Sequence, residues 1–271
     1  MATIFTTHGV VKRWNPSLLS DLYLLDHTAF KEFLKKQNKT FVDLKDALDG
    51  KGDAMTIDDS MNCAFNCAIL ARAGGHQVTL FVNPLQVEIQ KPYPLSLLSV
   101  ALDQTPLRKI TWNDREYPLY KVAQKLKFRK AVKAAMQKVG DWKQRYKFII
   151  RVCQGLLVPR LNIPPYLQPL SKEEILELKN KGVRLENHGF SHGEFSNLSE
   201  ENIKAEIEKG KKWLKANFAV TSTAFAAPFG RAKPTFPLIG KWEIDWFLLD
   251  ESLNNGRIQP RVYNRKMLIL D

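Results

Sequence analysis

The chain has 271 residues, 44% of them hydrophobic and 25% charged, which is the composition of an ordinary globular protein. This length allows one large α/β domain or two small ones, and no apolar run reaches the roughly 20 residues of a membrane span. Three cysteines without a framework spacing agree with a reducing compartment. The amino terminus lacks the basic segment and apolar core of a secretory signal, so we expect a cytoplasmic protein, with a peripheral position at the inner membrane left open.

The formal net charge of +13 is concentrated in one segment. Residues 103–160 hold 15 of the lysines and arginines but only 4 of the aspartates and glutamates. A localised basic field favours an anionic partner, either a phosphate group, an anionic membrane surface or nucleic acid. Charge alone does not choose among these partners.

Short apolar runs recur along the chain, and each leads into a polar residue. Their length and their content of Val, Ile, Phe, Leu and Thr predict strands. These runs cover residues 2–8, 53–60, 76–84, 182–188, 221–230, 242–251 and 257–263.

Helical patterns lie between the predicted strands. Residues 60–75 have apolar side chains at helical spacing and end at two glycines, and residues 171–182 begin with a capping-box pattern. Residues 199–218 repeat this pattern. The alternation predicts parallel strands with helices outside, in a barrel or in an open doubly wound sheet. The basic residues from about 103 to 165 interrupt it and are expected to form a helical insertion.

The carboxyl ends of parallel strands form one rim, where sites of α/β proteins are built. The predicted strands would bring a set of polar and special residues to that rim: His8, Asp58, Asp59, Asn83, His188, Pro228 and Arg261.

Two pairs of rim residues have the chemistry of a metal site. Asp58 and Asp59 are adjacent, so one carboxylate can bind a cation while its neighbour acts on a water. An isolated pair of this kind is more often a loop followed by a helix cap. His188 and His192 are four residues apart and follow another predicted strand, so both can reach one metal from a loop or a single turn. With an aspartate, they leave a coordination position open, as catalytic metals require.

Two cysteines at the same spacing, Cys63 and Cys67, lie on or near the apolar face of the predicted helix at 60–75. Free cysteine behaves as a small hydrophobic residue, so we expect these two in the core rather than at a metal.

Three segments resemble, in order and in rough spacing, the first three motifs of the polysaccharide deacetylases. They are "TIDDS" (56–60), "NHGFSH" (187–192) and "FAAPFG" (225–230). This family, carbohydrate esterase family four, includes chitin, peptidoglycan and chitooligosaccharide deacetylases. The resemblance implies a distorted (β/α)7 barrel as a single domain over 1–271, with the basic insertion at about 103–165. It also implies a metal-dependent amide hydrolase.

The resemblance assigns roles to the motif residues. Asp59, His188 and His192 would hold a divalent cation, most often zinc, with cobalt, nickel and manganese as alternatives. Asp58 would be the general base, and the backbone N–H of Phe229 would help to hold the oxyanion.

The chain departs from the family pattern at two functional positions. Ala226 stands where an arginine that orients the base is frequent, and no histidine follows His192, although a late histidine serves this family as general acid. We therefore expect His8 to act as the acid or to contact substrate. Arg261 is expected to contact substrate or support the base, and Asn187 to contact substrate.

These features predict a cytoplasmic de-N-acetylase that acts on an acetamido sugar. Without a secretion signal, the expected substrate is a nucleotide- or lipid-linked precursor of surface polysaccharide or O-antigen in lipopolysaccharide biosynthesis. The basic segment would meet phosphates or the inner membrane face, and no specific nucleic acid is expected.

Two alternatives stay open at this point. A metal-independent amidohydrolase of a small non-sugar amide would have no need of Asp59 with both histidines. A barrel that has lost catalysis and only binds glycan or nucleic acid would explain the missing arginine and late histidine.

Overall fold

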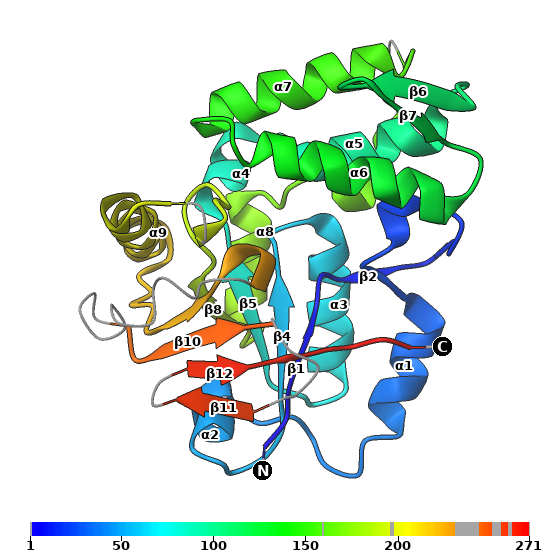
Figure 1. Cartoon of the computed structure of the whole chain (residues 1–271). Helices are drawn as coiled ribbons and strands as arrows, with labels where there is room; N and C mark the ends of the chain where they lie inside the picture. Colours follow the sequence, from blue (N-terminus) through cyan, green and yellow to red (C-terminus); the bar gives the residue numbers. More distant parts are fainter. Residues whose placement is uncertain are drawn as a thin grey trace.

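A computed structural model describes residues 2–158, 160–195, 198–230, 244–250 and 262–270, together with the backbone of 256–259 (Figure 1). The strands are β1 (Ile4–Thr7), β2 (Val10–Val11), β3 (Leu25–Asp26), β4 (Ala54–Asp58), β5 (Val78–Val82), β6 (Lys109–Trp112), β7 (Arg115–Pro118), β8 (Arg184–Asn187), β9 (Ala224–Ala226), β10 (Trp246–Leu249), β11 (Gly256–Gln259), β12 (Val262–Asn264) and β13 (Lys266–Met267). The helices are α1 (His27–Lys35), α2 (Leu44–Leu48), α3 (Asn62–Ala73), α4 (Pro84–Ile89), α5 (Pro94–Gln104), α6 (Val122–Met136), α7 (Trp142–Gly155), α8 (Lys172–Asn180) and α9 (Glu200–Phe218).

The main sheet is a nearly closed barrel of parallel strands. Its order is β11-β12-β10-β9-β8-β5-β4-β1-β13, and only the β11–β12 pairing is antiparallel. The helices α3, α8 and α9 each connect one barrel strand to the next along the chain, as strand–helix–strand units require. The barrel predicted from the sequence is thus confirmed, and the open doubly wound sheet is excluded.

The carboxyl-terminal strand closes the ring. β12 pairs with β10 and β13 pairs with β1, and the two are separated only by Arg265. One nearly continuous stretch of chain therefore joins both edges of the sheet. Counted as one strand, β12–β13 completes seven parallel positions with β1, β4, β5, β8, β9 and β10.

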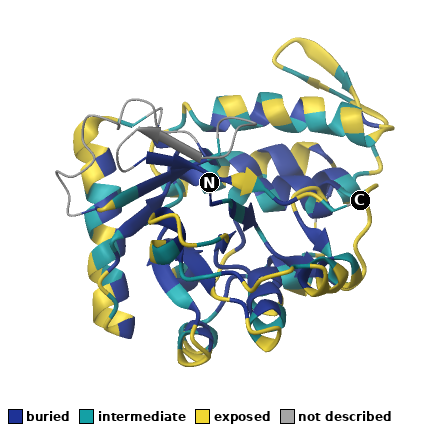
Figure 2. Cartoon of the chain, turned by 90° about the horizontal axis from the view of Figure 1, so that it is seen from below, coloured by how far each residue is buried: buried dark blue, intermediate teal, exposed yellow. Residues whose placement is uncertain are grey.

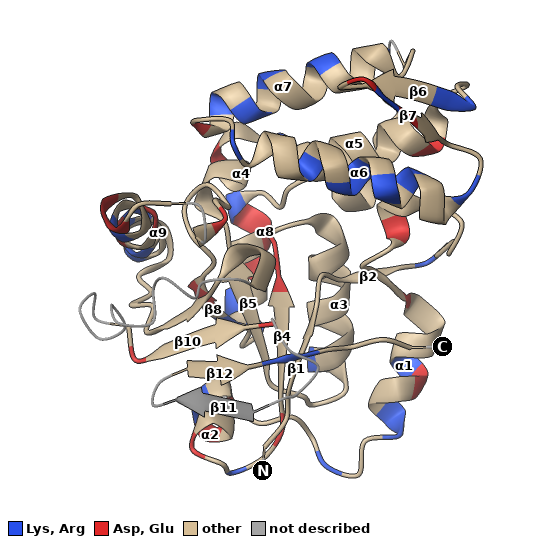
Figure 3. Cartoon of the chain, in the orientation of Figure 1, with Lys and Arg blue, Asp and Glu red and all other residues tan. Residues whose placement is uncertain are grey.

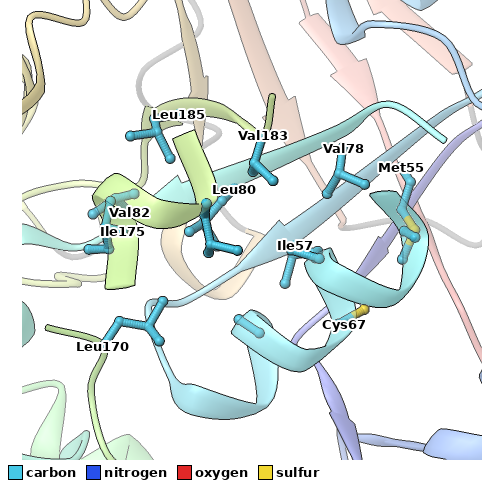
Figure 4. Close-up of a cluster of buried hydrophobic side chains, with 14 of the residues drawn as sticks. Met55, Ile57, Cys67, Val78, Leu80, Val82, Leu170, Ile175, Val183 and Leu185 are labelled. Carbon is cyan, nitrogen blue, oxygen red and sulfur yellow. The ribbon is translucent and has the colours of Figure 1, made fainter. Parts of the chain in front are cut away.

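A layer of aliphatic side chains lies between the barrel strands and the outer helices. Figure 4 shows side chains of β4, β5 and β8 against α3 and α8, with Cys67 among them. Cys63 and Cys67 are both fully buried, so their predicted place in the core is confirmed. Figure 2 shows buried strands, with exposed positions mainly on the outer sides of the helices.

Two of the predicted helix starts form as the sequence indicates. The Ser171 hydroxyl accepts from the Glu174 N–H while the Glu174 carboxylate accepts from the Ser171 N–H, which is a complete capping box. The Ser199 hydroxyl accepts from the Asn202 N–H at the start of α9.

The chain between β5 and α8 lies over the carboxyl ends of the barrel strands (Figure 1). Helices α5, α6 and α7 pack there on their own hydrophobic cluster. The sequence predicts a helical insertion over 103–165; α6 and α7 agree, but residues 109–118 form an antiparallel hairpin. Asn113 and Asp114 at its tip both have positive φ, the two-residue turn that favours hairpins, and "TWNDREY" is a signal for it.

In the described part of the chain, no helix combines the length and the apolar character that a bilayer crossing requires.

Candidate metal and catalytic site

A cavity of about 340 Å³ lies between the barrel rim and helices α5–α7. Parallel strands all end at this rim, which explains why residues distant in sequence meet here. The sequence-predicted residues that line the cavity are His8, Asp58, Asp59, His188, His192 and Phe229.

Three of these side chains converge closely. Asp59, His188 and His192 each offer one ligand atom, and these atoms all lie within 4.8 Å of one another. The Nε2 atoms of His188 and His192 are 3.6 and 3.2 Å from Asp59 Oδ1. That carboxylate oxygen is buried and has no hydrogen-bond partner among the described residues. A buried oxygen without a donor, facing two imidazole nitrogens, fits a divalent cation held by three protein ligands.

The state of His188 suits a metal ligand. Its Nδ1 lies 2.8 Å from the carbonyl oxygen of Ala226, so the N–H donates to that carbonyl and Nε2 keeps its lone pair toward Asp59. Burial lowers the pKa of His188 to about 4, which keeps the ring neutral at neutral pH. Burial opposes ionisation of Asp59, but the nearby His192 outweighs it and holds the pKa of Asp59 well below its usual range.

The two histidines lie on a loop after β8 rather than on a helix. Gly189 has φ 78° and His192 has φ 57°, so the backbone turns back and brings both rings to one point. Glu206 of α9 holds this loop, because its carboxylate accepts from the Ser191 N–H at 2.7 Å and from the Ser191 hydroxyl at 2.6 Å. The backbone of Asp59 is also in the left-handed region, with φ 63°. Strained backbone conformations of this kind are frequent at functional sites.

Asp58 is tied to an arginine that the sequence reasoning missed. Arg265, at the junction of β12 and β13, donates to both carboxylate oxygens of Asp58 at 2.7 and 2.6 Å. Its other side donates to Asp250 at 2.8 and 3.0 Å. Burial disfavours the charged form of Asp58, yet Arg265 outweighs it and lowers the pKa of Asp58. Burial raises the pKa of Asp250.

The departure at Ala226 is therefore compensated elsewhere in the chain. Asp58 does contact an arginine, but this arginine is Arg265 of the closing strand. The sequence signal was a charged side chain inside the apolar end "VYNRKMLIL". Arg261, four residues earlier, lies outside the described residues.

His8 follows β1 and reaches the cavity from the strand next to β13. Its ring centroid lies 6.0 Å from that of Tyr23. The Nδ1 atom of His8 is buried without a hydrogen-bond partner among the described residues. A polar ring atom of this kind is available to a ligand in the cavity.

Phe229 and Asn187 take different places. Phe229 has φ 62° and its ring lies 4.6 Å from the His192 ring, at the cavity wall. Asn187 is fully buried, accepts from the Gly189 N–H at 3.0 Å and donates to the Ile207 carbonyl at 2.9 Å. The expected substrate contact of Asn187 is therefore corrected: its amide braces the histidine loop against α9 and does not line the cavity.

The sequence is similar to known deacetylases. The family model described as polysaccharide deacetylase matches residues 108–241. Among solved structures, a Streptococcus pyogenes deacetylase in complex with acetate aligns with a TM-score of 0.61 at 14% identity, over 99% of this chain and 92% of that one. IcaB from Ammonifex degensii aligns with a TM-score of 0.57 at 13% identity, over 99% and 91%.

A polysaccharide deacetylase from Bacillus cereus shares the fold as well, with a TM-score of 0.56 at 12% identity, over 98% of this chain and 64% of that one. These structural likenesses show the fold, and the family model adds the sequence match. The sequence of residues 108–241 is thus similar to the polysaccharide deacetylases, and the whole chain has the fold of these solved structures.

Proposed function

We propose that this protein is a metal-dependent de-N-acetylase that removes the acetyl group from an acetamido sugar. The convergence of Asp59, His188 and His192 beside Asp58 carries this proposal. The set of one carboxylate and two imidazoles favours zinc, with cobalt, nickel or manganese as alternatives. A divalent metal bound there would polarise the acetyl carbonyl and lower the pKa of the attacking water.

Asp58 is the proposed general base. Its carboxylate is buried and held in one orientation by two hydrogen bonds from Arg265, so it points in a fixed direction before substrate arrives. The same guanidinium keeps it ionised, as a base must be. Asp58 takes the proton of the attacking water, and the backbone N–H of Phe229 is the proposed donor to the oxyanion.

His8 is the proposed general acid. It lines the same cavity and has an unpartnered buried nitrogen among the described residues. Its strand neighbours β13, so it approaches from beside the closing strand that carries Arg265. From there His8 gives a proton to the departing amine of the sugar.

The proposed substrate is a precursor of surface polysaccharide or O-antigen, linked to a nucleotide or a lipid, and the proposed location is the cytoplasm or the inner membrane face. The basic side of the cavity supports an anionic substrate, because α6 and α7 contribute Arg129, Lys133 and Arg145 to its wall (Figure 3).

The test combines metal analysis of the purified protein with acetate release from N-acetylated nucleotide sugars, lipid-linked sugars and chitooligosaccharides. We expect about one divalent metal per chain and acetate release that chelation abolishes. A metal-free protein whose activity does not change in Asp59→Ala would contradict the proposal.

A further inference from the structure

Helix α6 carries two cations on the side that faces the cavity. Arg129 and Lys133 are four residues apart, so they lie on one face of the helix, and both line the cavity. Figure 3 shows other basic positions along α6 and α7. Lys127 and Lys130, on the same helix, are exposed and do not line the cavity.

Arg129 is charged and largely removed from water without a carboxylate to balance it. Its Nε donates to the Ser99 hydroxyl at 2.8 Å, and its guanidinium carbon lies 5.6 Å from the Tyr23 ring centroid. No carboxylate pairs with it in the part of the chain that the structure describes. Removing a cation from water is costly unless an anion compensates it.

Arg145 of α7, the third cation of this wall, differs in this respect. Three carboxylates act on it electrostatically: Glu206, Asp141 and Glu194. These carboxylates partly offset the burial that lowers the pKa of Arg145, whereas no carboxylate of the described residues acts on Arg129, whose charge is left for a ligand.

Lys133 lies close to the candidate metal ligands. Its Nζ is 4.0 Å from the centroid of the Phe229 ring, and that ring lies 4.6 Å from the ring of His192. One aromatic side chain thus separates the ammonium group from a metal ligand. Tyr23 contacts both Arg129 and the ring of His8. Each of the two cations is therefore separated by one aromatic side chain from a histidine of the candidate site.

We propose that Arg129 and Lys133 form a subsite for the phosphate of a 2-acetamido sugar that is phosphorylated at its anomeric oxygen. In such a sugar the phosphate and the acetamido group are on adjacent ring carbons, so both reach their sites only if cations lie near the metal. Arg and Lys are the side chains that bind phosphate by charge-assisted hydrogen bonds. The inference rests on the proposed function and specifies its substrate class.

The size of the cavity agrees with this substrate. About 340 Å³ is at the small end of the roughly 300–1,000 Å³ typical of ligand pockets. Helices α5–α7 wall the cavity on the side opposite the barrel rim. A sugar with its phosphate can be accommodated in a space of this size.

The test compares the affinity for glucosamine 1-phosphate, the product of the proposed reaction, with that for methyl glucosaminide, which lacks the phosphate. Calorimetry on the full chain with its metal measures both without turnover. We expect glucosamine 1-phosphate to bind about tenfold more tightly than methyl glucosaminide. Arg129→Gln or Lys133→Gln should remove most of this difference in affinity. Arg129→Lys, which keeps the charge, should retain part of it.

Lys127→Gln and Lys130→Gln are matched controls, because they remove the same charge from exposed positions of the same helix. They should keep the preference. Equal affinity for both ligands in the unaltered protein, or an equal loss in Lys127→Gln and Arg129→Gln, would overturn the subsite.

Acetate release from different substrates shows which phosphorylated sugar is used. It also tests the subsite independently of the deacetylase proposal. Three substrates share the anomeric phosphate: N-acetylglucosamine 1-phosphate, uridine diphosphate N-acetylglucosamine and a polyprenyl-phosphate-linked N-acetylglucosamine. Preference for any of them over chitooligosaccharides supports the subsite. Release only from chitooligosaccharides would overturn the subsite and leave the deacetylase proposal standing. No release from any substrate, with phosphate-dependent binding through Arg129 intact, would contradict the deacetylase proposal and support the subsite.

Discussion

Arg265 and Asp58 form a buried, two-bond ion pair, with distances of 2.7 and 2.6 Å, although 207 residues separate them in the chain. Arg265 has 1% and Asp58 2% of its surface exposed. The pair joins the closing strand to β4 at the barrel rim and orients the proposed base. Because Asp250 contacts the same guanidinium, two carboxylates share one cation.

Replacing Arg265 with lysine should reduce activity more than charge alone explains. Lysine keeps the positive charge but cannot donate to both Asp58 oxygens in a fixed plane. We expect kcat/KM for acetate release to fall about 10–100-fold, as is typical when a group that orients an active residue is lost. Loss of a hydrogen bond to the buried Asp58 carboxylate should also lower the free energy of unfolding by about 1.5–3 kcal/mol.

Arg184→Lys is the control for that stability loss. Arg184 pairs with the buried carboxylate of Glu186 at 2.6 Å on β8, and neither residue lines the cavity. The Arg184→Lys variant should therefore be less stable but keep its kcat/KM. An equal loss of kcat/KM in both variants would mean that Arg265 acts only through stability.

The two adjacent aspartates should separate metal binding from proton transfer. Asp59→Asn removes a ligand charge and should lose the metal, measured by elemental analysis of the purified protein. Asp58→Asn should keep the metal but lose about 10²–10⁴-fold in kcat, the usual contribution of a general base. Full metal content in Asp59→Asn, or loss of metal in Asp58→Asn, would reverse the two assignments.

His8→Gln should lower kcat by about 10²–10⁴-fold if His8 protonates the departing amine. The measurement is turnover of an acetylated sugar at saturating concentration, with metal content checked in parallel. His27→Gln is the control, because His27 begins α1 and does not line the cavity. Near-normal turnover by the His8 variant would remove its role as acid.

Glu206→Ala should weaken metal binding without removing a ligand. The Glu206 carboxylate holds Ser191, one residue before His192, by two hydrogen bonds. Loss of such a support typically costs 10–100-fold in metal affinity, which competition with a chelator would measure. Glu208→Ala should leave the affinity unchanged, because the Glu208 carboxylate is on the same helix and pairs with Lys204 at 3.8 Å on the surface. Similar losses in both variants would indicate a general effect on α9.

The sequence determined the alternation of parallel strands with helices and the candidate metal ligands, because these depend on local patterns. The choice of a barrel over an open sheet came only from the family resemblance. Apolar runs alternate with capped helices. Asp58, Asp59 and His188 follow two of these runs, at the ends of parallel strands. The hairpin at 109–118 was missed although its turn was visible in Asn113–Asp114, because the surrounding basic residues suggested a continuous helical segment.

The tertiary structure decided what local patterns cannot express. Asn187 and His188 are neighbours in the chain, yet one braces a helix and the other faces the cavity, because successive side chains at a strand end point to opposite sides. Arg265 reaches Asp58 only because the last strand closes the ring between β10 and β1. Contacts of this kind depend on how the barrel closes, and no spacing in the sequence records that closure.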